Sequence, residues 1–293
     1  MLENPLVTVV CTCFNHQKYV IESLQSVLDQ TYKGIQIIVV DDCSTDDSVA
    51  IIENFILDKP EILFIKNEKN IGLTKSVNHA MTYANCDYFI DLSADDILLP
   101  HCIATQVATF KESKFENLAI VYGNAELITE TGEHERFYFE VNEDLKVINQ
   151  KKSGDLYAEI LSMKTVICSV SAMYKKSFFD KLDGYDEQLS YEDLDYWLRI
   201  SRKYTIEYVN DVLVQKRNMP NSLQSTLYSN KNKNSNSTHT ILIKAFSLNK
   251  SKEEFSIMKK RVNFEMINAY RNDNYKLLFL NSWLRIKLTL KSI

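Results

Sequence analysis

The sequence predicts an α/β fold in which a mostly parallel sheet carries helices on both faces. Apolar, β-branched runs alternate with amphipathic segments between residues 6 and 113, a pattern typical of consecutive β-α units. The second half mixes strands and helices without regular alternation, which indicates an α+β region. Residues 241–272 have helical spacing, which indicates a mainly helical C-terminal extension.

The first half begins with a buried strand at residues 6–14, and Asn15 is a plausible N-cap for the helix that follows. This helix is predicted from the helical spacing of Val20, Leu24 and Val27. The other strands of this half are predicted at 35–40, 62–65 and 87–92, and the other helices at about 46–57, 73–84 and 100–113.

The elements after residue 113 are less regular. We expect strands at 118–122, 168–174 and 205–214, helices near 155–163 and at 191–203, and an irregular polar stretch at 129–153. Residues 284–291 alternate as a strand would, but Leu and Lys favour helix, so this segment stays open between the two.

The polar segment 229–240 has no apolar periodicity and is predicted to be a linker. It separates a predicted domain from the C-terminal extension. The predicted division is a domain at 1–228 with halves 1–122 and 123–228, the linker at 229–240, and the extension at 241–293.

Composition places the chain among globular proteins. Its 293 residues are 45% hydrophobic, which is enough for a sizeable core and excludes disorder of the whole. No run approaches about 18 apolar residues, and an acid stands near the N-terminus where a signal peptide carries positive charge, so we expect a cytoplasmic protein. The six cysteines lack CxxC spacing and are interpreted as reduced, mostly buried thiols.

Charge is distributed unevenly. The net charge is −5, yet from residue 231 onward 13 Lys and Arg stand against 4 Asp and Glu, so this part carries +9 and the preceding residues −14. The asymmetry suggests a basic appendage for an anionic surface. The alternative, a solvated helical face, is equally compatible with the composition.

Several chemistries are excluded by missing motifs. With six glycines the chain has no GxGxxG and no GxxxxGK[ST], which excludes dinucleotide-binding dehydrogenases and P-loop NTPases. The nucleophile-elbow motif GxSxG and the zinc-protease motif HExxH are absent as well. The histidines lack metal-ligand spacing. His16 follows the first strand and could face a pocket, but a solvated loop position is the more common situation for such a residue.

Acidic residues gather at three places. Asp41 and Asp42 end one strand, Asp95 and Asp96 follow another, and the run 191–199 (YEDLDYWLR) opens a helix. Each group alone could simply lead into a helix, where the dipole favours carboxylates. Together, at successive element ends of an open α/β sheet, they indicate a site for a hard cation and the phosphate that it carries.

These segments also carry a family resemblance. The chain resembles family 2 glycosyltransferases with the GT-A fold over roughly residues 6–218. The matching runs are residues 7–48, 67–81 (NEKNIGLTKSVNHAM), 91–100 (DLSADDILLP), 182–189 (LDGYDEQL) and 191–199. The resemblance implies a GT-A-type nucleotide-binding sheet with an acceptor-binding half. It also implies an enzyme that moves a sugar from a nucleotide-sugar donor to an acceptor hydroxyl with inversion, in bacterial cell-surface polysaccharide or glycan biosynthesis.

By position, the resemblance implies the donor contacts. Thr12 and Phe14 stand where the family contacts base and ribose, and Asp42 resembles the acid that accepts from a uracil or thymine imide. Lys75 could meet the diphosphate, although a solvated lysine is an equally good interpretation. A UDP- or dTDP-sugar is therefore the expected donor, with UDP favoured.

The resemblance also implies the metal and the base. Asp95 and Asp96 occupy the motif for Mn²⁺ or Mg²⁺, with Asp96 expected to be the direct ligand, and Asp193 stands at the place of the catalytic base. Ser93 replaces the first acid of that motif, which leaves the choice of metal open. Cys43 replaces a common glycine, and Thr12 replaces a proline.

Two other functions remain open. A sugar nucleotidyltransferase on a similar sheet would need a glycine-rich phosphate loop, and residues 11–19 contain no glycine. A nucleotide-sugar-binding module without transfer activity is opposed only by the third acidic group. The expected partners are a nucleotide-sugar donor, a glycan or lipid-linked acceptor and the inner face of the cytoplasmic membrane through 241–293. No nucleic acid is expected, and the sequence leaves the oligomeric state open.

Overall fold

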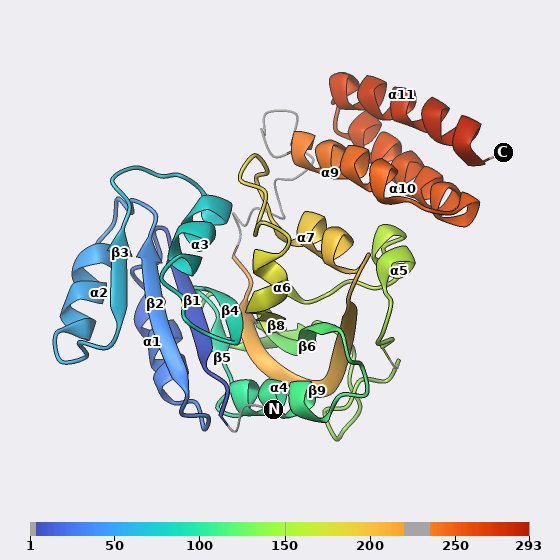
Figure 1. Cartoon of the computed structure of the whole chain (residues 1–293). Helices are drawn as coiled ribbons and strands as arrows, with labels where there is room; N and C mark the ends of the chain where they lie inside the picture. The colour runs from blue at the N-terminus through green and yellow to red at the C-terminus, as the bar shows by residue number, and fades with distance from the viewer. Residues whose placement is uncertain (1–3, 150, 220–234, 293) are drawn as a thin grey trace. The chain divides into compact units, whose positions relative to one another are not determined.

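The computed structural model describes residues 4–149, 151–219 and 235–292 (Figure 1). The chain forms two compact units, each assembled from separate segments. The first unit comprises residues 1–154, 167–184 and 205–218, and the second comprises 155–166, 185–204 and 219–293.

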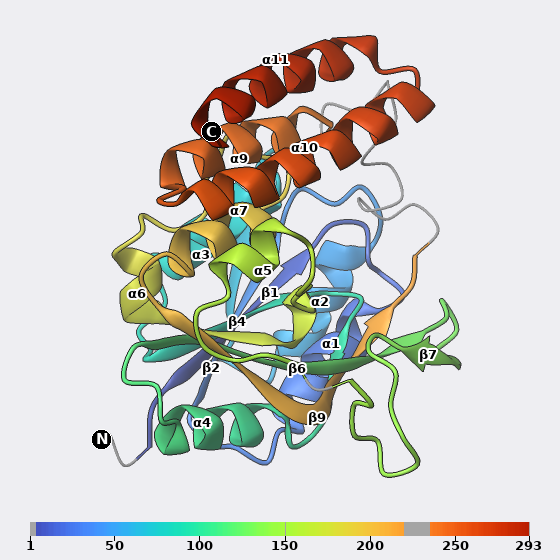
Figure 2. The ribbon, with the colours of Figure 1, turned by 90° about the vertical axis from the view of Figure 1, so that its right-hand side faces the viewer.

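The first unit contains, among the described residues, a nine-stranded sheet of order β3-β2-β1-β4-β8-β6-β9-β5, with β7 paired to β6. The strands β3, β2, β1 and β4 are parallel, β8 runs antiparallel to both β4 and β6, and β9 runs parallel to β6 (Figure 2). The strands are β1 (Val7–Cys13), β2 (Ile35–Asp41), β3 (Leu63–Lys66), β4 (Tyr88–Ser93), β5 (Ile97–Leu98), β6 (Leu118–Ile128), β7 (His134–Phe137), β8 (Ala172–Lys175) and β9 (Thr205–Arg217).

The helices of this unit are α1 (Val20–Leu28), α2 (Ser48–Ile56), α3 (Leu73–Met81), α4 (Cys102–Glu112) and α6 (Lys176–Asp180), with a 3₁₀ turn η1 at Ser169–Ser171. Successive side chains of a strand point to opposite faces. Val7, Val9 and Cys11 of β1 therefore share one core, which also contains Leu24 of α1 and Ile103 of α4. The predicted β-α alternation is confirmed, and the sheet becomes mixed only beyond β4.

The second unit is helical in its described residues. Its helices are α5 (Tyr157–Leu161), α7 (Asp193–Ile200), α9 (Ser235–Leu248), α10 (Lys252–Arg271) and α11 (Tyr275–Ser292). The predicted helical extension is confirmed, and 284–291, which the sequence left open, is helix. No helix in the described ranges is long and apolar enough to cross a membrane.

The predicted linker at 229–240 needs correction, because α9 begins at Ser235 and its first six residues are helical. Residues 229–234 lie outside the described residues. The polar start of α9 makes side-chain contacts that composition does not reveal. Ser237 Oγ accepts from the Ser190 amide at 3.0 Å, and Thr238 Oγ1 lies 2.6 Å from the Tyr191 hydroxyl. The segment that opens α7 is therefore anchored to α9.

A second correction concerns Asn15, which does not cap α1. The helix begins at Val20 after Tyr19, and Asn15 adopts φ +58°. Its Oδ1 instead accepts from the Thr45 amide at 2.8 Å and from the Thr45 hydroxyl at 3.2 Å. Asn15 thus joins the loop after β1 to the loop after β2.

Arg217 at the end of β9 holds three segments of the first unit together. Its guanidinium donates to the carbonyls of Asp95 at 3.1 Å, Thr129 at 3.2 Å and Glu130 at 3.0 Å. It also pairs with Glu22 of α1 at 2.6 Å. Because Arg217 is only 5% exposed, most of these bonds lie away from water.

We expect Arg217→Lys to destabilise the protein strongly. An ammonium cannot reproduce the planar fork of donors, so buried carbonyls lose their partners, and the free energy of unfolding should fall by on the order of 3 kcal/mol. Glu22→Gln is the matched control: its carboxylate is half exposed, and its loss should change stability by about 1 kcal/mol or less. Urea unfolding of the full chain measures both, and equal stability of the two variants would contradict the assignment.

Candidate active site

The carboxyl ends of β1, β2 and β4 meet at one edge of the sheet because these strands are parallel and adjacent (Figure 1). Thr12 pairs in register with Ser93, and Cys13 pairs with Asp41. The sequence-predicted acids of the first half therefore follow β2 and β4, the two strands that flank β1, at the edge where open α/β sheets bind ligands.

Asp42 binds the loop that leads into α3. Its carboxylate accepts from the Asn67 amide group at 2.9 Å and from the backbone N–H groups of Ile71 at 2.9 Å and Gly72 at 2.8 Å. Gly72 precedes the first residue of α3, so a negative charge sits at the N-terminus of that helix, where the dipole stabilises it. A carboxylate offers about four acceptor positions, so these three bonds leave room for one more donor.

Two non-glycine residues with left-handed backbone flank this edge. Asn15 (φ +58°) follows β1 and Cys43 (φ +66°) follows β2. Glycine adopts this region without the steric penalty of a Cβ atom, whereas Asn15 and Cys43 carry one. Strained backbone of this kind concentrates at functional sites. The turn is held by Asp41, whose carboxylate accepts from the Ser44 amide at 2.8 Å.

Asp95 and Asp96 differ in accessibility. Asp96 is 3% exposed and accepts from the Arg217 backbone N–H at 2.9 Å. The Asp95 side chain is 13% exposed, and its Oδ1 accepts from the Ser93 hydroxyl at 2.5 Å. Although the sequence favoured Asp96 as the direct metal ligand, the carboxylate that can meet a ligand more readily is that of Asp95.

The environment of Asp96 favours its neutral form. Burial raises the pKa of its carboxyl well above the usual value, and the nearby negative charge of Asp95 raises it further. The hydrogen bond from the Arg217 amide lowers the pKa of Asp96 but offsets only part of this rise. A carboxyl that holds its proton more tightly is a weaker ligand for a hard cation, so of the two groups Asp95 is the better suited to meet one.

The predicted donor contacts occupy distinct positions. Phe14 is exposed on the loop after β1, whereas Thr12 is buried within the strand. Lys75 lies on α3 and is exposed, without an ion pair to any residue in the described ranges. Phe14 and Lys75 are therefore accessible to a ligand, and Thr12 can act only at the end of its strand.

The third acidic group belongs to the second unit. Asp193 is half-buried and begins α7, and its Oδ1 accepts from the Leu194 amide at 2.6 Å. Asp195 is buried and pairs with Arg199 at 2.7 Å and with Lys244 of α9 at 2.8 Å. Asp195 therefore holds α7 to α9.

Sequence reasoning missed two residues of this edge. Arg217 carried no motif, and its only signal was a positive charge at the end of an apolar strand. His16 was interpreted as a solvated loop residue, but its ring is largely buried and its Nδ1 lies 3.9 Å from Asp95 Oδ1. No group of three or more His, Cys, Asp or Glu side chains with metal-binding geometry occurs among the described residues.

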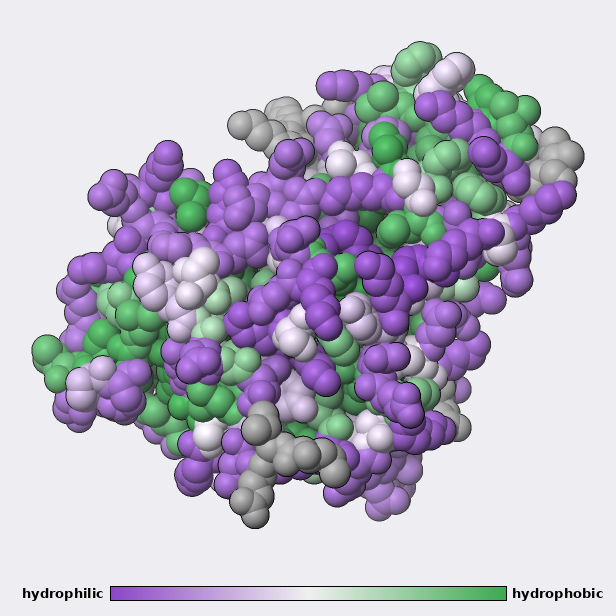
Figure 3. Space-filling view, viewed as in Figure 1, coloured by the Kyte–Doolittle hydropathy of each residue, from purple (hydrophilic) through white to green (hydrophobic). Residues whose placement is uncertain are grey.

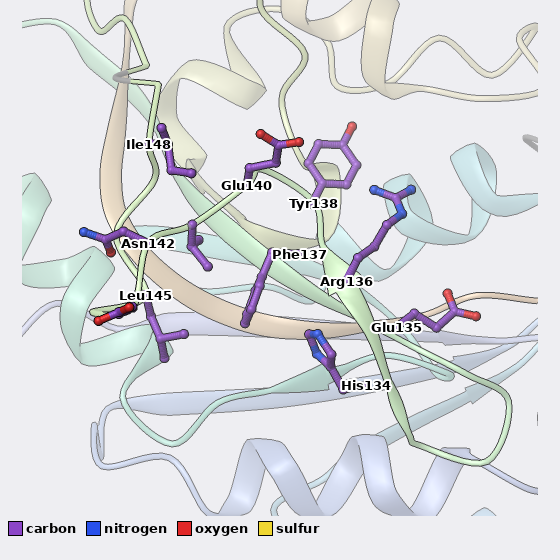
Figure 4. A pocket seen from close by; sticks show the side chains of 11 residues that line it. His134, Glu135, Arg136, Phe137, Tyr138, Glu140, Asn142, Leu145 and Ile148 are labelled. Carbon is purple, nitrogen blue, oxygen red and sulfur yellow. The ribbon is translucent and has the colours of Figure 1, made fainter.

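A separate hollow of about 840 Å³ lies within the predicted irregular polar stretch 129–153 of the first unit (Figure 4). It is open to solvent and is formed by β7 and the segment that follows it. None of the predicted site residues lines it. The lining residues are His134, Glu135, Arg136, Phe137, Tyr138, Glu140, Val141, Asn142, Glu143, Leu145 and Ile148.

The raised pKa of Asp96 predicts a pH dependence of stability in metal-free buffer. The folded state holds the Asp96 proton more tightly than the unfolded state. The free energy of unfolding of the protein should therefore fall as pH rises from the usual pKa of the group, about 4, through its raised pKa in the folded state. Asp96→Asn keeps the acceptor for the Arg217 N–H but does not titrate. Urea unfolding between pH 5 and 8 should therefore show that the free energy of unfolding of the variant increases relative to that of the parent as pH rises. Parallel curves would contradict the prediction.

Comparison with known proteins identifies the family of the chain. The family model described as "Glycosyl transferase family 2" matches residues 8–183, more than half of the chain. An uncharacterized glycosyltransferase of Methanocaldococcus jannaschii is 30% identical over 224 residues, which cover 75% of this chain and 73% of that protein. A chondroitin synthase of Escherichia coli is 24% identical over 209 residues, 71% of this chain and 28% of that protein. The chain also spans about a third of two relatives from Rickettsia bellii and Rickettsia felis.

Solved structures share the fold. Staphylococcus aureus TarS (residues 1–349) in complex with UDP-GlcNAc is 18% identical with a TM-score of 0.64, covering 87% of this chain and 71% of that one. The mannosyltransferase PcManGT of Pyrobaculum calidifontis, in complex with GDP-Man and Mn²⁺, is 16% identical with a TM-score of 0.63, covering 99% and 74%. Because these two bind different nucleotides, fold likeness does not select the donor. The family match over residues 8–183 establishes that the chain belongs to glycosyl transferase family 2.

Proposed function

We propose that this chain is an inverting glycosyltransferase that moves a sugar from a UDP- or dTDP-sugar to an acceptor hydroxyl in cell-surface glycan synthesis. The observation that carries the proposal is the position of Asp42 and Asp95 at the carboxyl edge of three parallel strands, after the two strands that flank β1, inside the family-matched region. Carboxylates there can hold a nucleotide base on one side and a cation with its diphosphate on the other.

The donor assignment depends on Asp42. Its carboxylate has about one acceptor position left beyond its bonds to Asn67, Ile71 and Gly72. Uracil and thymine carry an imide N–H between two carbonyl groups that can fill this position. Cytosine has no hydrogen on that ring nitrogen, and the ring N–H of guanine lies on a larger, bicyclic base. A buried acceptor that stays unpaired disfavours the wrong base strongly. Exposed Phe14 can lie against the base or ribose.

The leaving diphosphate needs positive charge. Asp95 is the carboxylate suited to hold Mn²⁺ or Mg²⁺, which when bound stabilises the negative charge that develops on the departing diphosphate. Lys75 on α3 has no ion pair among the described residues and can add its ammonium to the same charge. The acceptor hydroxyl requires a base, and we assign this role to Asp193, whose carboxylate is half-buried.

Calorimetry with UDP, dTDP, GDP and CDP in the presence of Mn²⁺ tests the donor. We expect UDP and dTDP to bind at least about tenfold more tightly than GDP and CDP, because the pyrimidine imide N–H is the donor that we match to the remaining acceptor position of Asp42. Asp42→Asn should reduce that preference, and circular dichroism checks that the loop change leaves the fold intact. Tighter binding of GDP than of UDP would overturn the assignment.

The base assignment is tested with a pair of variants on α7. Asp193→Asn should keep UDP affinity and stability but slow transfer by roughly 10²–10⁴, because an amide cannot take the proton. Asp195→Asn should instead lower the free energy of unfolding by on the order of 2 kcal/mol, between the values for exposed and buried pairs, because it weakens the bonds to Arg199 and Lys244.

Transfer rates, UDP calorimetry and urea unfolding of both variants separate these effects. Parental transfer by Asp193→Asn would remove the base assignment. UDP binding by a parent protein that transfers and hydrolyses no UDP-sugar would favour a binding module.

We also propose that α11 places the enzyme on an anionic membrane, where the acceptor is lipid-linked. Five large side chains form one stripe of α11 and are 53–74% exposed: Tyr275, Phe279, Trp283, Ile286 and Leu290. This α11 stripe is distinct from the opposite face of the helix, where Leu277, Leu284 and Leu288 are buried. Figure 3 shows apolar surface interspersed with polar surface on the C-terminal helices.

The charge of α11 favours lipid over a second copy of the chain. The helix carries Lys276, Arg285, Lys287 and Lys291 and no acidic residue. Two such stripes packed together would bring like charges close, whereas an anionic bilayer complements them at about 1 kcal/mol per basic residue. Aromatic rings such as Trp283 suit the headgroup region of a membrane.

Vesicle co-sedimentation tests this surface. The parent should bind phosphatidylglycerol vesicles at low salt, less at high salt, and phosphatidylcholine vesicles weakly. Phe279→Ser with Trp283→Ser should abolish binding, and Leu57→Ser, an equally exposed position of the first unit, should not. Truncation before α9 is unsuitable, because it removes Lys244 from Asp195. Equal sedimentation of parent and stripe variant, or a dimer dissolved by the same substitutions, would contradict the proposal.

A further inference from the structure

The imidazole of His16 has an unused nitrogen at the acidic edge. Its Nδ1 is buried and makes no hydrogen bond to any described residue. The nearest carboxylate oxygen is Asp95 Oδ1 at 3.9 Å, which is too long for a hydrogen bond. A buried polar atom without a partner costs about 1–3 kcal/mol, so this nitrogen points to a ligand that the protein normally meets there.

The backbone of His16 and the carboxylate of Asp95 are held in place by hydrogen bonds. The His16 amide donates to Ser48 Oγ at 3.1 Å, and the His16 carbonyl accepts from the amides of Tyr19 at 2.9 Å and Val20 at 3.0 Å. Asp95 is fixed by the bond from Ser93 to its Oδ1. Neither side chain has to move for a third group to lie between them.

We propose that His16 Nδ1 and an oxygen of Asp95 are the two protein ligands of the divalent cation. Two ligand atoms at about 2.1 Å from one ion lie about 3.0 Å apart at a right angle and about 4.2 Å apart when opposite, so 3.9 Å falls within that span. The cation could also bind Asp95 through Oδ2, which has no hydrogen bond from the described residues. Diphosphate and water complete the shell.

This arrangement also accounts for the shortened acidic motif. Ser93 stands where the family often has an acid, and Asp96 is buried against Arg217, so Asp95 alone would be a weak cation site. An imidazole restores a second ligand. It also changes selectivity, because imidazole nitrogen suits first-row transition ions and suits Mg²⁺ poorly. We therefore infer a preference for Mn²⁺ over Mg²⁺.

The test uses Mn²⁺ alone and the full-length protein. Electron spin-echo modulation of bound Mn²⁺ detects a directly bonded nitrogen, and a shell of only oxygen ligands gives no such coupling. We expect nitrogen coupling in the parent and its loss in His16→Gln, with Mn²⁺ affinity falling at least about tenfold and Mg²⁺ affinity changing less. His134→Gln is the matched control, because His134 also lies beside a carboxylate, 2.7 Å from Glu126.

Each outcome decides the question. Mn²⁺ that binds the parent without nitrogen coupling, coupling that persists in His16→Gln, or no Mn²⁺ binding at all would overturn the proposal. Because the spectrum of the parent is informative without any variant, a folding defect in His16→Gln does not remove the test. The proposal rests on the proposed function only for the family's use of a cation. A protein that shows nitrogen coupling but transfers no sugar would keep this site and refute the function, and the reverse result would refute the site alone.

Discussion

The geometry of the candidate donor site depends on one buried guanidinium. Arg217 holds the turn at Asp95, the loop at Thr129 and Glu130, and helix α1 through Glu22. A guanidinium is charged at every relevant pH and donates in a fixed plane, so the accepting groups must keep their positions relative to one another. Its backbone N–H binds Asp96, which turns that carboxyl inward and leaves its neighbour available to a ligand.

The second unit uses the same principle with a different cation. Lys244 of α9 pairs with Asp195 and with Asp186, and Arg202 pairs with Glu254 of α10 at 2.6 Å while lying over the ring of Tyr157. The C-terminal helices are therefore part of the framework that positions α7 and its first residue. This explains why a segment that looked like an appendage by charge cannot be removed without exposing buried ion pairs.

The two units place their polar groups in opposite ways. In the first unit, carboxylates stand at the ends of β2 and β4, an arrangement that suits the divalent cation proposed above. In α11, by contrast, basic residues border an exposed apolar stripe and no acid is present. The acidic residues at this edge and the basic residues of α11 both contribute to the uneven charge along the chain.

The sequence alone determined the β-α order and the placement of acids after β2 and β4, because hydrophobic periodicity and parallel pairing depend on local pattern. It could not decide between Asp95 and Asp96, nor identify Arg217 or the unpartnered nitrogen of His16. Those features depend on contacts between distant parts of the chain: the Arg217 bond to Asp96 joins residues 121 positions apart. Burial and pairing of this kind arise only when β9 packs into the sheet, so only the tertiary structure could show them.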